Sequence, residues 1–475
     1  MMNGKKIFIA GIALMGFSAW AFPSAPKGTE WESEQELGLN KLPPRAWFGH
    51  FPDTESAKKI LMQESPWHRF LDSETDWRFK WTKCPKNRPT DFYKVDYDVS
   101  DWDVVKVPCS WQTIGIRKSL ERFGMPLFLN QCYIWAGSLK VPAPEGLWPK
   151  VTGAEVPKDW YLGPEDNPVG SYRRDFEVSE EWLKGDVFLK FDGVDSFYYL
   201  WVNGRYVGFA KDSRTPSEFE VTDLVAAGEN TVALEVYRYS DGSYLEDQDM
   251  FRLSGIFRST WLVRRPQTFI RDFFVKTRPA KAREFDGDWV LEVEVEEKEV
   301  ERRGGGGGEG LTISLFTIED KEVELTPLSA SSPRLYSVAK PKLWSPETPN
   351  CYKLVIGNGR EYVSGVVGFR TSEIVNGRYE LNGRKVKLHG ANRHETDPLY
   401  GHYVPRERHE QDIRMLKEAN CNIVRNSHYP QDDYWYYLCN VYGIALMDEA
   451  NMECHGYWEG GDDPQFTAAM VWRNV

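Results

Sequence analysis

The pattern of apolar residues changes near Arg370, and this change limits the possible fold more than any other feature of the sequence. Before it, short apolar runs are separated by Gly, Pro, Asn and Asp, which is typical of antiparallel β-structure. After it, strand-like and helix-like segments alternate, as they do when helices connect parallel strands. We therefore expect β-sandwiches followed by an α/β unit.

The clearest hairpin lies in the first β-rich region, expected over residues 46–267. The strand Phe197–Val202 is followed by Asn203-Gly204, and a return strand begins at Arg205. Asn-Gly supplies the two positive-φ residues of a tight turn between twisted strands. Many short strands of this kind predict a sandwich or jelly roll.

A second β-rich region is expected over residues 268–371. Leu291, Val293 and Val295 alternate with glutamates, which predicts a strand with one buried face. The glycine run Gly304–Gly308 lacks the spacing of a phosphate-binding loop and indicates a flexible connection. A region of about 100 residues has the size of an immunoglobulin-like sandwich.

The third region, residues 372–475, alternates strands and helices. Strands are expected at Val386–His389, Ile423–Arg425 and Ile444–Met447, and helices at Pro405–Asn420 and Asp432–Tyr442. Polar clusters follow the strands, at Asn392–Glu395, Ser427–Tyr429 and Asp448–His455. In a (β/α)₈ TIM barrel such clusters form the catalytic face, so we expect the first three βα units of an incomplete barrel.

The N-terminal residues have the pattern of a secretory signal peptide. Lys5 and Lys6 precede the apolar run Ile7–Phe17, and Ala19-Trp20-Ala21 offers a small-x-small cleavage site. We expect residues 1–21 to be a signal peptide, residues 22–45 to be an extension, and the protein to be periplasmic or extracellular. No run reaches the length of a membrane-spanning helix. The formal charge of −12 argues against a nucleic-acid partner.

Several ordered blocks resemble the family 2 glycoside hydrolases, and among them the large bacterial β-galactosidases. In the third region these blocks are Gly368–Arg370, Leu381–Gly383, Gly390–Glu395, Val424–Pro430 and Asp448–Gly456. Upstream, Asp212–Phe219, Ser240–Met250 and Ser254–Arg258 resemble that family's sugar-binding domain. The resemblance extends from about Trp31 to the last residue. It implies a retaining enzyme that hydrolyses terminal β-D-galactosyl residues.

Retaining hydrolysis needs two carboxyl groups about 5–5.5 Å apart. Asp448 and Glu449 are adjacent at a strand end, so their side chains should point to opposite sides. The resemblance places the acid/base after the fourth barrel strand and the nucleophile after the seventh, and neither motif occurs among these 475 residues. We therefore expect no catalytic residue in this chain and no hydrolysis by it alone.

Glu453 and His455 are candidate metal ligands. They are two positions apart, so both side chains can fall on one side of an extended segment. The resemblance implies that they bind Mg²⁺ beside the acid/base. Because imidazole is a softer ligand than Mg²⁺ usually takes, Mn²⁺ and Zn²⁺ are alternatives. Without the acid/base as a further ligand, the affinity for the metal should be weak.

The resemblance also implies four substrate-binding residues. Asn130 and Asp249 would reach the sugar hydroxyls from the first region, with Na⁺ near Asp249, and His394 and His428 would contact the galactosyl ring. Arg425 is expected to orient nearby carboxylates through a bidentate pair.

The main alternative is a non-catalytic carbohydrate-binding or accessory protein. A metallohydrolase is less consistent with the sequence, which has no HExxH spacing. The expected partners are β-galactoside saccharides and, at full length, a second copy of the chain in a homo-oligomer.

Overall fold

The structure is a computed structural model. It describes residues 22–33, 35–46, 48–118, 122–129, 133–137, 161–299, 310–455 and 464–474. The expected signal peptide at residues 1–21 lies outside these ranges. No helix in the described ranges is long and apolar enough to cross a membrane.

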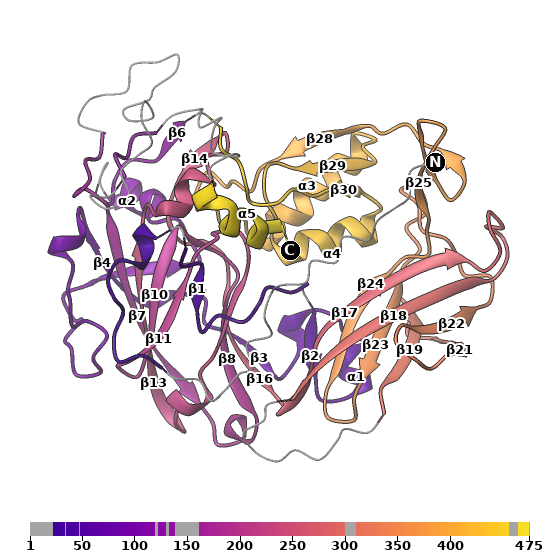
Figure 1. Cartoon of the computed structure of the whole chain (residues 1–475), viewed down its shortest axis with the longest axis horizontal. Helices are drawn as coiled ribbons and strands as arrows, with labels where there is room; N and C mark the ends of the chain where they lie inside the picture. The colour runs from indigo at the N-terminus through magenta and orange to yellow at the C-terminus, as the bar shows by residue number, and fades with distance from the viewer. Residues whose placement is uncertain are drawn as a thin grey trace.

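The first sandwich, on the left of Figure 1, packs two antiparallel sheets face to face. Among the described residues, the larger sheet has the order β1 (Gly38–Leu39), β11 (Arg205–Ala210), β10 (Phe197–Val202), β13 (Gly228–Tyr237), β7 (Val169–Val178), β4 (Ser73–Thr82) and β5 (Asp103–Val107). The smaller sheet has the order β12 (Ser217–Glu220), β8 (Asp186–Phe191), β16 (Thr260–Arg265) and β3 (His68–Phe70).

Strand β10 shows why the larger sheet is apolar on both faces. Every second side chain, including Tyr198 and Leu200, enters the core between the two sheets. The alternate side chains, including Tyr199 and Trp201, enter an aromatic cluster on the other face. The predicted turn is confirmed, with φ of 50° at Asn203 and 77° at Gly204.

The second sandwich also has two antiparallel sheets. One contains β17 (Thr268–Pro279), β18 (Trp289–Glu299), β22 (Arg334–Val338) and β21 (Thr326–Ser329). The other contains β2 (Gly49–Phe51), β24 (Tyr362–Val367), β23 (Tyr352–Gly357), β19 (Thr312–Thr317) and β20 (Glu322–Val323). Strand β2 comes from the range predicted for the first sandwich, yet it pairs with β24. Leu291 and Val293 of β18 are fully buried, as their alternation with glutamates predicts.

The α/β unit, residues 372–474, lies above the second sandwich in Figure 1. After the hairpin β25 (Ser372–Val375), β26 (Arg378–Leu381) and β27 (Arg384–Lys385), its described residues form three parallel strands and three α-helices. These are β28 (Gly390–Arg393), α3 (Arg406–Glu418), β29 (Ile423–Asn426), α4 (Asp433–Tyr442), β30 (Ala445–Met447) and α5 (Thr467–Asn474).

The first parallel strand lies four residues later than the sequence pattern predicts. Val386–His389 is more apolar, but Gly390–Arg393 aligns with Ile423–Asn426 to form the parallel ladder. The Asn422 side chain bonds the backbone of Lys387 and His389 and so fixes the segment just before the strand. Hydrogen-bond register therefore decides the position of β28, and its residues need not be apolar.

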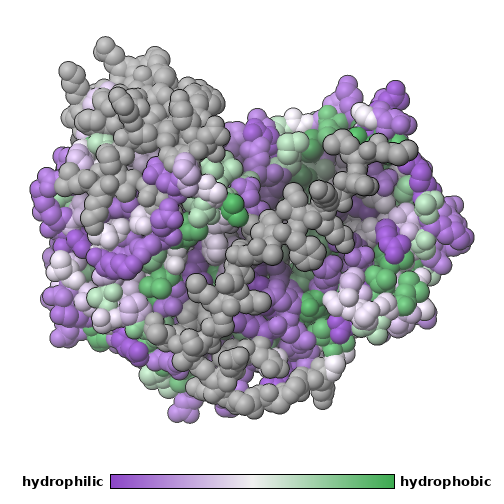
Figure 2. Space-filling view, in the orientation of Figure 1, coloured by the Kyte–Doolittle hydropathy of each residue, from purple (hydrophilic) through white to green (hydrophobic). Residues whose placement is uncertain are grey.

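The parallel sheet is open within the described residues, where β28 and β30 each pair on one side only. Leu388, beside the sheet, is 40% exposed, and Met447 of β30 is 50% exposed. Figure 2 shows hydrophobic residues on the surface where these strands lie.

Candidate functional site

The carboxyl ends of the three parallel strands bring polar side chains to one edge of the sheet. His394 follows β28, His428 comes two residues after β29, and Glu449 comes two residues after β30. Because the strands are parallel and adjacent, their ends meet at the same edge. We call these three residues, together with the side chains that contact them at this edge, the strand-end site.

His394 and His428 lie in contact at this edge. Their ring centroids are 5.2 Å apart and their planes are nearly perpendicular. His394 Nδ1 lies 3.4 Å from the Tyr429 hydroxyl. Burial, with smaller contributions from the neighbouring His428 and Arg214, lowers the pKa of His394 to about 4. His394 is therefore neutral at neutral pH, and a neutral imidazole can both donate and accept hydrogen bonds to a hydroxylated ligand.

The first sandwich contributes a carboxylate to the same site. His455 Nδ1 lies 2.9 Å from Asp249 Oδ1 and 3.3 Å from Glu453 Oε1. Backbone bonds connect the two segments, since Asp247 donates to the Glu453 carbonyl and Glu453 donates to the Leu245 carbonyl. Burial raises the pKa of Glu453, and the two nearby histidines oppose that shift. Five of the six predicted site residues, Asp249 among them, are thus brought together from two structural units.

Asp448 and Glu449 point in different directions, as the sequence argument predicts. Asp448 accepts hydrogen bonds from Asn426 and, at 2.8 Å, from the Tyr436 hydroxyl. Glu449 instead pairs with Arg425 and lies 3.4 Å from His428 Nδ1. The expected contact between Arg425 and a carboxylate is present, and Asp448 and Glu449 cannot serve one sugar together.

Arg214 is a component of the site that the sequence argument does not single out. It belongs to the first sandwich, is 1% exposed, and lies 3.9 Å from the centroid of the Tyr429 ring. Its Nη2 lies 2.9 Å from His402 Nδ1, and its Nη1 lies 3.9 Å from Glu395. The only signal in the sequence is its place in the block Asp212–Phe219, which gives no partner for the side chain.

Asn130, the fourth predicted substrate-binding residue, lies outside the described residues. The preceding strand β6 (Leu127–Leu129) pairs with β14 (Met250–Arg252), which begins directly after Asp249.

The described residues contain no group of three or more His, Cys, Asp or Glu side chains already arranged around a metal position. Asp249, Glu453 and His455 nevertheless form a compact donor set of two carboxylates and one imidazole. Two carboxylates suit Mg²⁺, and the imidazole is equally compatible with Mn²⁺ or Zn²⁺. These donor types suit a divalent cation, but the described residues do not hold three of them where they could bind one ion.

Three consecutive family models match the chain. The model described as "Glycosyl hydrolases family 2, sugar binding domain" matches residues 70–266. "Glycosyl hydrolases family 2" matches residues 268–370, and "Glycosyl hydrolases family 2, TIM barrel domain" matches residues 372–472.

A curated relative is a β-galactosidase from Priestia megaterium (strain DSM 319 / IMG 1521), which is 35% identical over 445 residues. The alignment covers 90% of this chain but only 40% of that protein. Two solved structures share the fold at 19% identity. A β-glucuronidase from an uncultured Clostridium sp. has a TM-score of 0.61, with 81% of this chain and 59% of that chain covered. A β-glucuronidase from Ruminococcus gnavus in complex with C6-substituted uronic isofagomine has a TM-score of 0.64, with 86% and 63% covered.

Proposed function

We propose, from the premise that this chain belongs to glycosyl hydrolase family 2, that it forms the sugar-binding part of a retaining β-galactosidase. One observation carries the proposal. Asp249 of the first sandwich meets His394, His428, Glu453 and His455 at the ends of parallel strands. The alternating donors and acceptors of this set suit the hydroxyl groups of a pyranose.

The charge of the site favours a neutral galactosyl group over a glucuronyl group. Three carboxylates, Asp249, Glu449 and Glu453, lie at the site, and Arg425 is already paired with Glu449. A uronic acid carboxylate bound beside these three carboxylates would meet like charges, which costs binding energy. The similarity to the Priestia megaterium β-galactosidase supports the same choice.

We propose that the catalytic carboxyl pair is not among the residues that the structure describes. Asp448 is held by Asn426 and Tyr436, and Glu449 is held by Arg425, so neither is placed as a nucleophile or acid. The open edges of β28 and β30 support further strands that complete an eight-stranded barrel. The 475-residue chain alone should therefore bind galactosides without hydrolysing them.

We propose that Glu453 and His455 hold a divalent cation, with Mg²⁺ first and Mn²⁺ or Zn²⁺ as alternatives, and that Asp249 lies near a Na⁺ ion. A bound divalent cation would supply positive charge that tunes the proton affinity of a neighbouring acid. The chain's own residues orient the sugar: Asp249 accepts from hydroxyl groups, and the neutral His394 both donates and accepts. Export through the N-terminal segment and homo-oligomer formation at full length are part of the same proposal.

The test is a titration of the 475-residue chain with galactose, glucuronic acid and mannose. Binding is measured by calorimetry and by the NMR signals of the His394 imidazole. We expect saturable, millimolar binding of galactose that Asp249→Asn weakens at least tenfold, and no release of nitrophenol from nitrophenyl β-galactoside. Preferred binding of glucuronic acid would contradict the galactosidase assignment. Measurable hydrolysis would contradict the placement of the catalytic pair. If the complete gene product binds galactose but hydrolyses no galactoside, the protein is instead an accessory carbohydrate-binding protein.

A further inference from the structure

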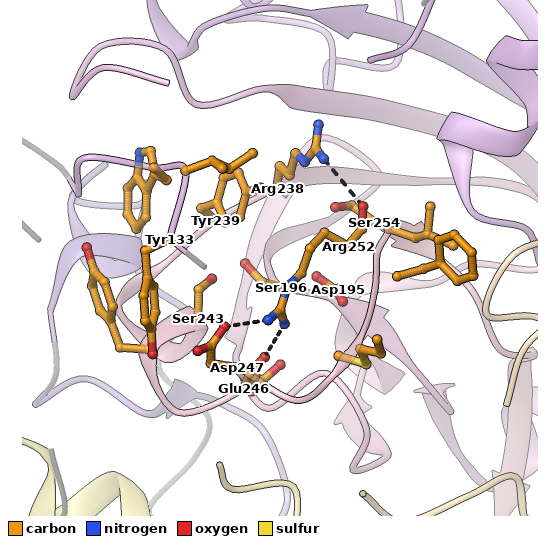
Figure 3. A pocket seen from close by; sticks show the side chains of 16 residues that line it. Tyr133, Asp195, Ser196, Arg238, Tyr239, Ser243, Glu246, Asp247, Arg252 and Ser254 are labelled. Atoms are coloured by element: carbon orange, nitrogen blue, oxygen red, sulfur yellow. Dashed lines mark hydrogen bonds and ion pairs between the residues drawn. The ribbon is translucent and has the colours of Figure 1, made fainter. Parts of the chain in front are cut away.

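A further pocket lies in the first sandwich (Figure 3), and its lining includes Asp247 and Met250, which come just before and after Asp249 in the sequence. Its cavity volume is about 50 Å³, and it opens to solvent on one side. Aromatic side chains form one wall and a set of charged side chains forms the other. The residues that line it include Tyr133, Ile134, Trp135, Asp195, Arg238 and Asp247.

Several polar atoms of this pocket lack a hydrogen-bond partner among the described residues. The indole N–H of Trp135, Nε of Arg238 and the hydroxyl of Tyr239 are buried and unpartnered there. The Asp195 carboxylate also has no hydrogen bond or ion pair within the described part of the chain, and burial raises its pKa to about 7. Buried polar groups are normally paired, so this concentration of unpaired donors and an acceptor points to a bound polar ligand.

Part of the charged wall is held in place by hydrogen bonds between its own residues. Arg252 donates to Asp247 and, at 3.1 Å, to the Glu246 carbonyl. The opposite wall is a stack of rings, with Trp135 at 5.5 Å from Tyr239 and 6.0 Å from Tyr244. Rigid aromatic surface beside fixed polar groups is the combination that recognises a compact, neutral, hydroxylated molecule.

We propose that this pocket is a second carbohydrate subsite, which takes a hydroxyl-bearing edge of a sugar ring and is distinct from the strand-end site. Asp195 accepts hydrogen bonds from sugar hydroxyls, while Trp135 and Arg238 donate to them. The ligand class rests on the proposed function, but the residues do not, because none of these three belongs to the strand-end site. The two sites are neighbours, since Asp247 lines the pocket and its backbone N–H donates to the Glu453 carbonyl.

The experiment observes each site separately in the 475-residue chain. Ile134 lines the pocket, so its ¹³C-labelled δ1 methyl group, assigned with Ile134→Val, reports on the pocket. The imidazole signals of His394 report on the strand-end site. Both are followed by NMR during titration with galactose and lactose. The variants are Asp195→Asn and Trp135→Phe in the pocket, Asp249→Asn at the strand-end site, and Asp101→Asn as an exposed control.

We expect the Ile134 methyl signal to shift saturably, with Kd raised about tenfold by Asp195→Asn and severalfold by Trp135→Phe, and unchanged in the Asp101→Asn control. Asp249→Asn should abolish the His394 titration and leave that of Ile134 intact. An Ile134 signal that does not move up to the solubility limit of the sugar overturns the subsite. A signal that moves but is lost in Asp249→Asn also overturns it, because the pocket is then not separate. If sugar shifts the Ile134 signal of the wild-type chain but not its His394 signals, only the proposed function is contradicted.

Discussion

The first sandwich and the α/β unit bury their apolar residues in different ways. In the sandwich, strand β10 has all six side chains buried, because each face of its sheet packs against a separate cluster. In the α/β unit, β28 has three of its four residues exposed, and a small cluster around Trp435 forms the core. Both faces of β10 are therefore buried, whereas β28 and β30 each pair on one side only within the described residues.

The contrast between the two units indicates which of them makes the strand-end site rigid. The histidines lie on the less covered unit, but the groups packed against them come from the sandwich. Arg214 lies against Tyr429, and Asp249 bonds His455. A precise binding site needs its contact residues held by a surrounding layer of packed side chains. Here the sandwich supplies that layer for a sheet that lacks it.

The largest expected effect comes from removing one matched tryptophan in each unit. Trp77 in the sandwich and Trp435 in the α/β unit are both fully buried, and each indole donates one hydrogen bond. Each change to alanine should cost about 3–5 kcal/mol of unfolding free energy. Trp435→Ala should unfold the α/β unit alone, while Trp77→Ala should disturb both units. Hydrogen exchange resolved by segment measures which unit loses its protection. Loss of protection over the same segments in both variants would contradict this prediction.

A smaller effect is expected for Asp195→Asn, which tests the unpaired carboxyl of the sandwich. Burial raises the pKa of Asp195 from 3.8 to about 7. The unfolded chain therefore loses this proton at lower pH than the folded chain, and the charged form costs stability as pH rises from 3.8 to 7. Asp195→Asn removes that cost, so the variant should gain up to about 4 kcal/mol over the wild type at pH 7.5 and little at pH 4.

Urea unfolding of both proteins at the two pH values measures this difference. A pH-independent difference between them would mean that Asp195 is not desolvated in the folded protein. Asp101→Asn, which changes an exposed carboxylate, is the matched control.

Local signals in the sequence predict the fold well. The Asn203-Gly204 turn and the helices near Pro405 and Asp432 follow from residue preferences that act over a few positions. The site is predicted only in part. Glu453 and His455 lie two positions apart, so their proximity is visible in the sequence. The contacts of Arg214 join residues about 190 positions apart, and no periodicity or turn preference encodes a contact of that kind.

The position of β28 shows the same limit, because its register depends on a partner strand more than thirty residues away.

A still smaller effect is expected when the positive charge that the sandwich places near the strand-end site is removed. The Arg214 guanidinium helps to lower the pKa of His394. Arg214→Met should raise this pKa by about half a unit toward 6.5, whereas Arg214→Lys keeps the charge and should leave it nearly unchanged. Titration of the His394 imidazole by NMR measures both. A pKa that moves equally in the two variants would show that Arg214 acts through packing and not through charge.

The smallest expected effect is that of Mg²⁺ on the 475-residue chain. Because Asp249, Glu453 and His455 supply at most three ligands, Mg²⁺ should bind in the millimolar range and shift the His455 signals slightly. Glu453→Gln should remove the shift, and addition of EDTA should reverse it. An effect of Mg²⁺ that survives in Glu453→Gln would place the cation elsewhere.

The pairing of β2 with β24 determines how this molecule can be divided for study. The second sandwich is discontinuous in the sequence, since Gly49–Phe51 complete a sheet otherwise built from residues 312–367. His50 and Glu361 form a fully buried pair across that junction. A shortened gene that starts at Thr268 would leave the edge of β24 unprotected and Glu361 without its histidine. Separate expression of the second sandwich therefore calls for a circular permutation or a grafted N-terminal strand, and not for a simple cut at the linker.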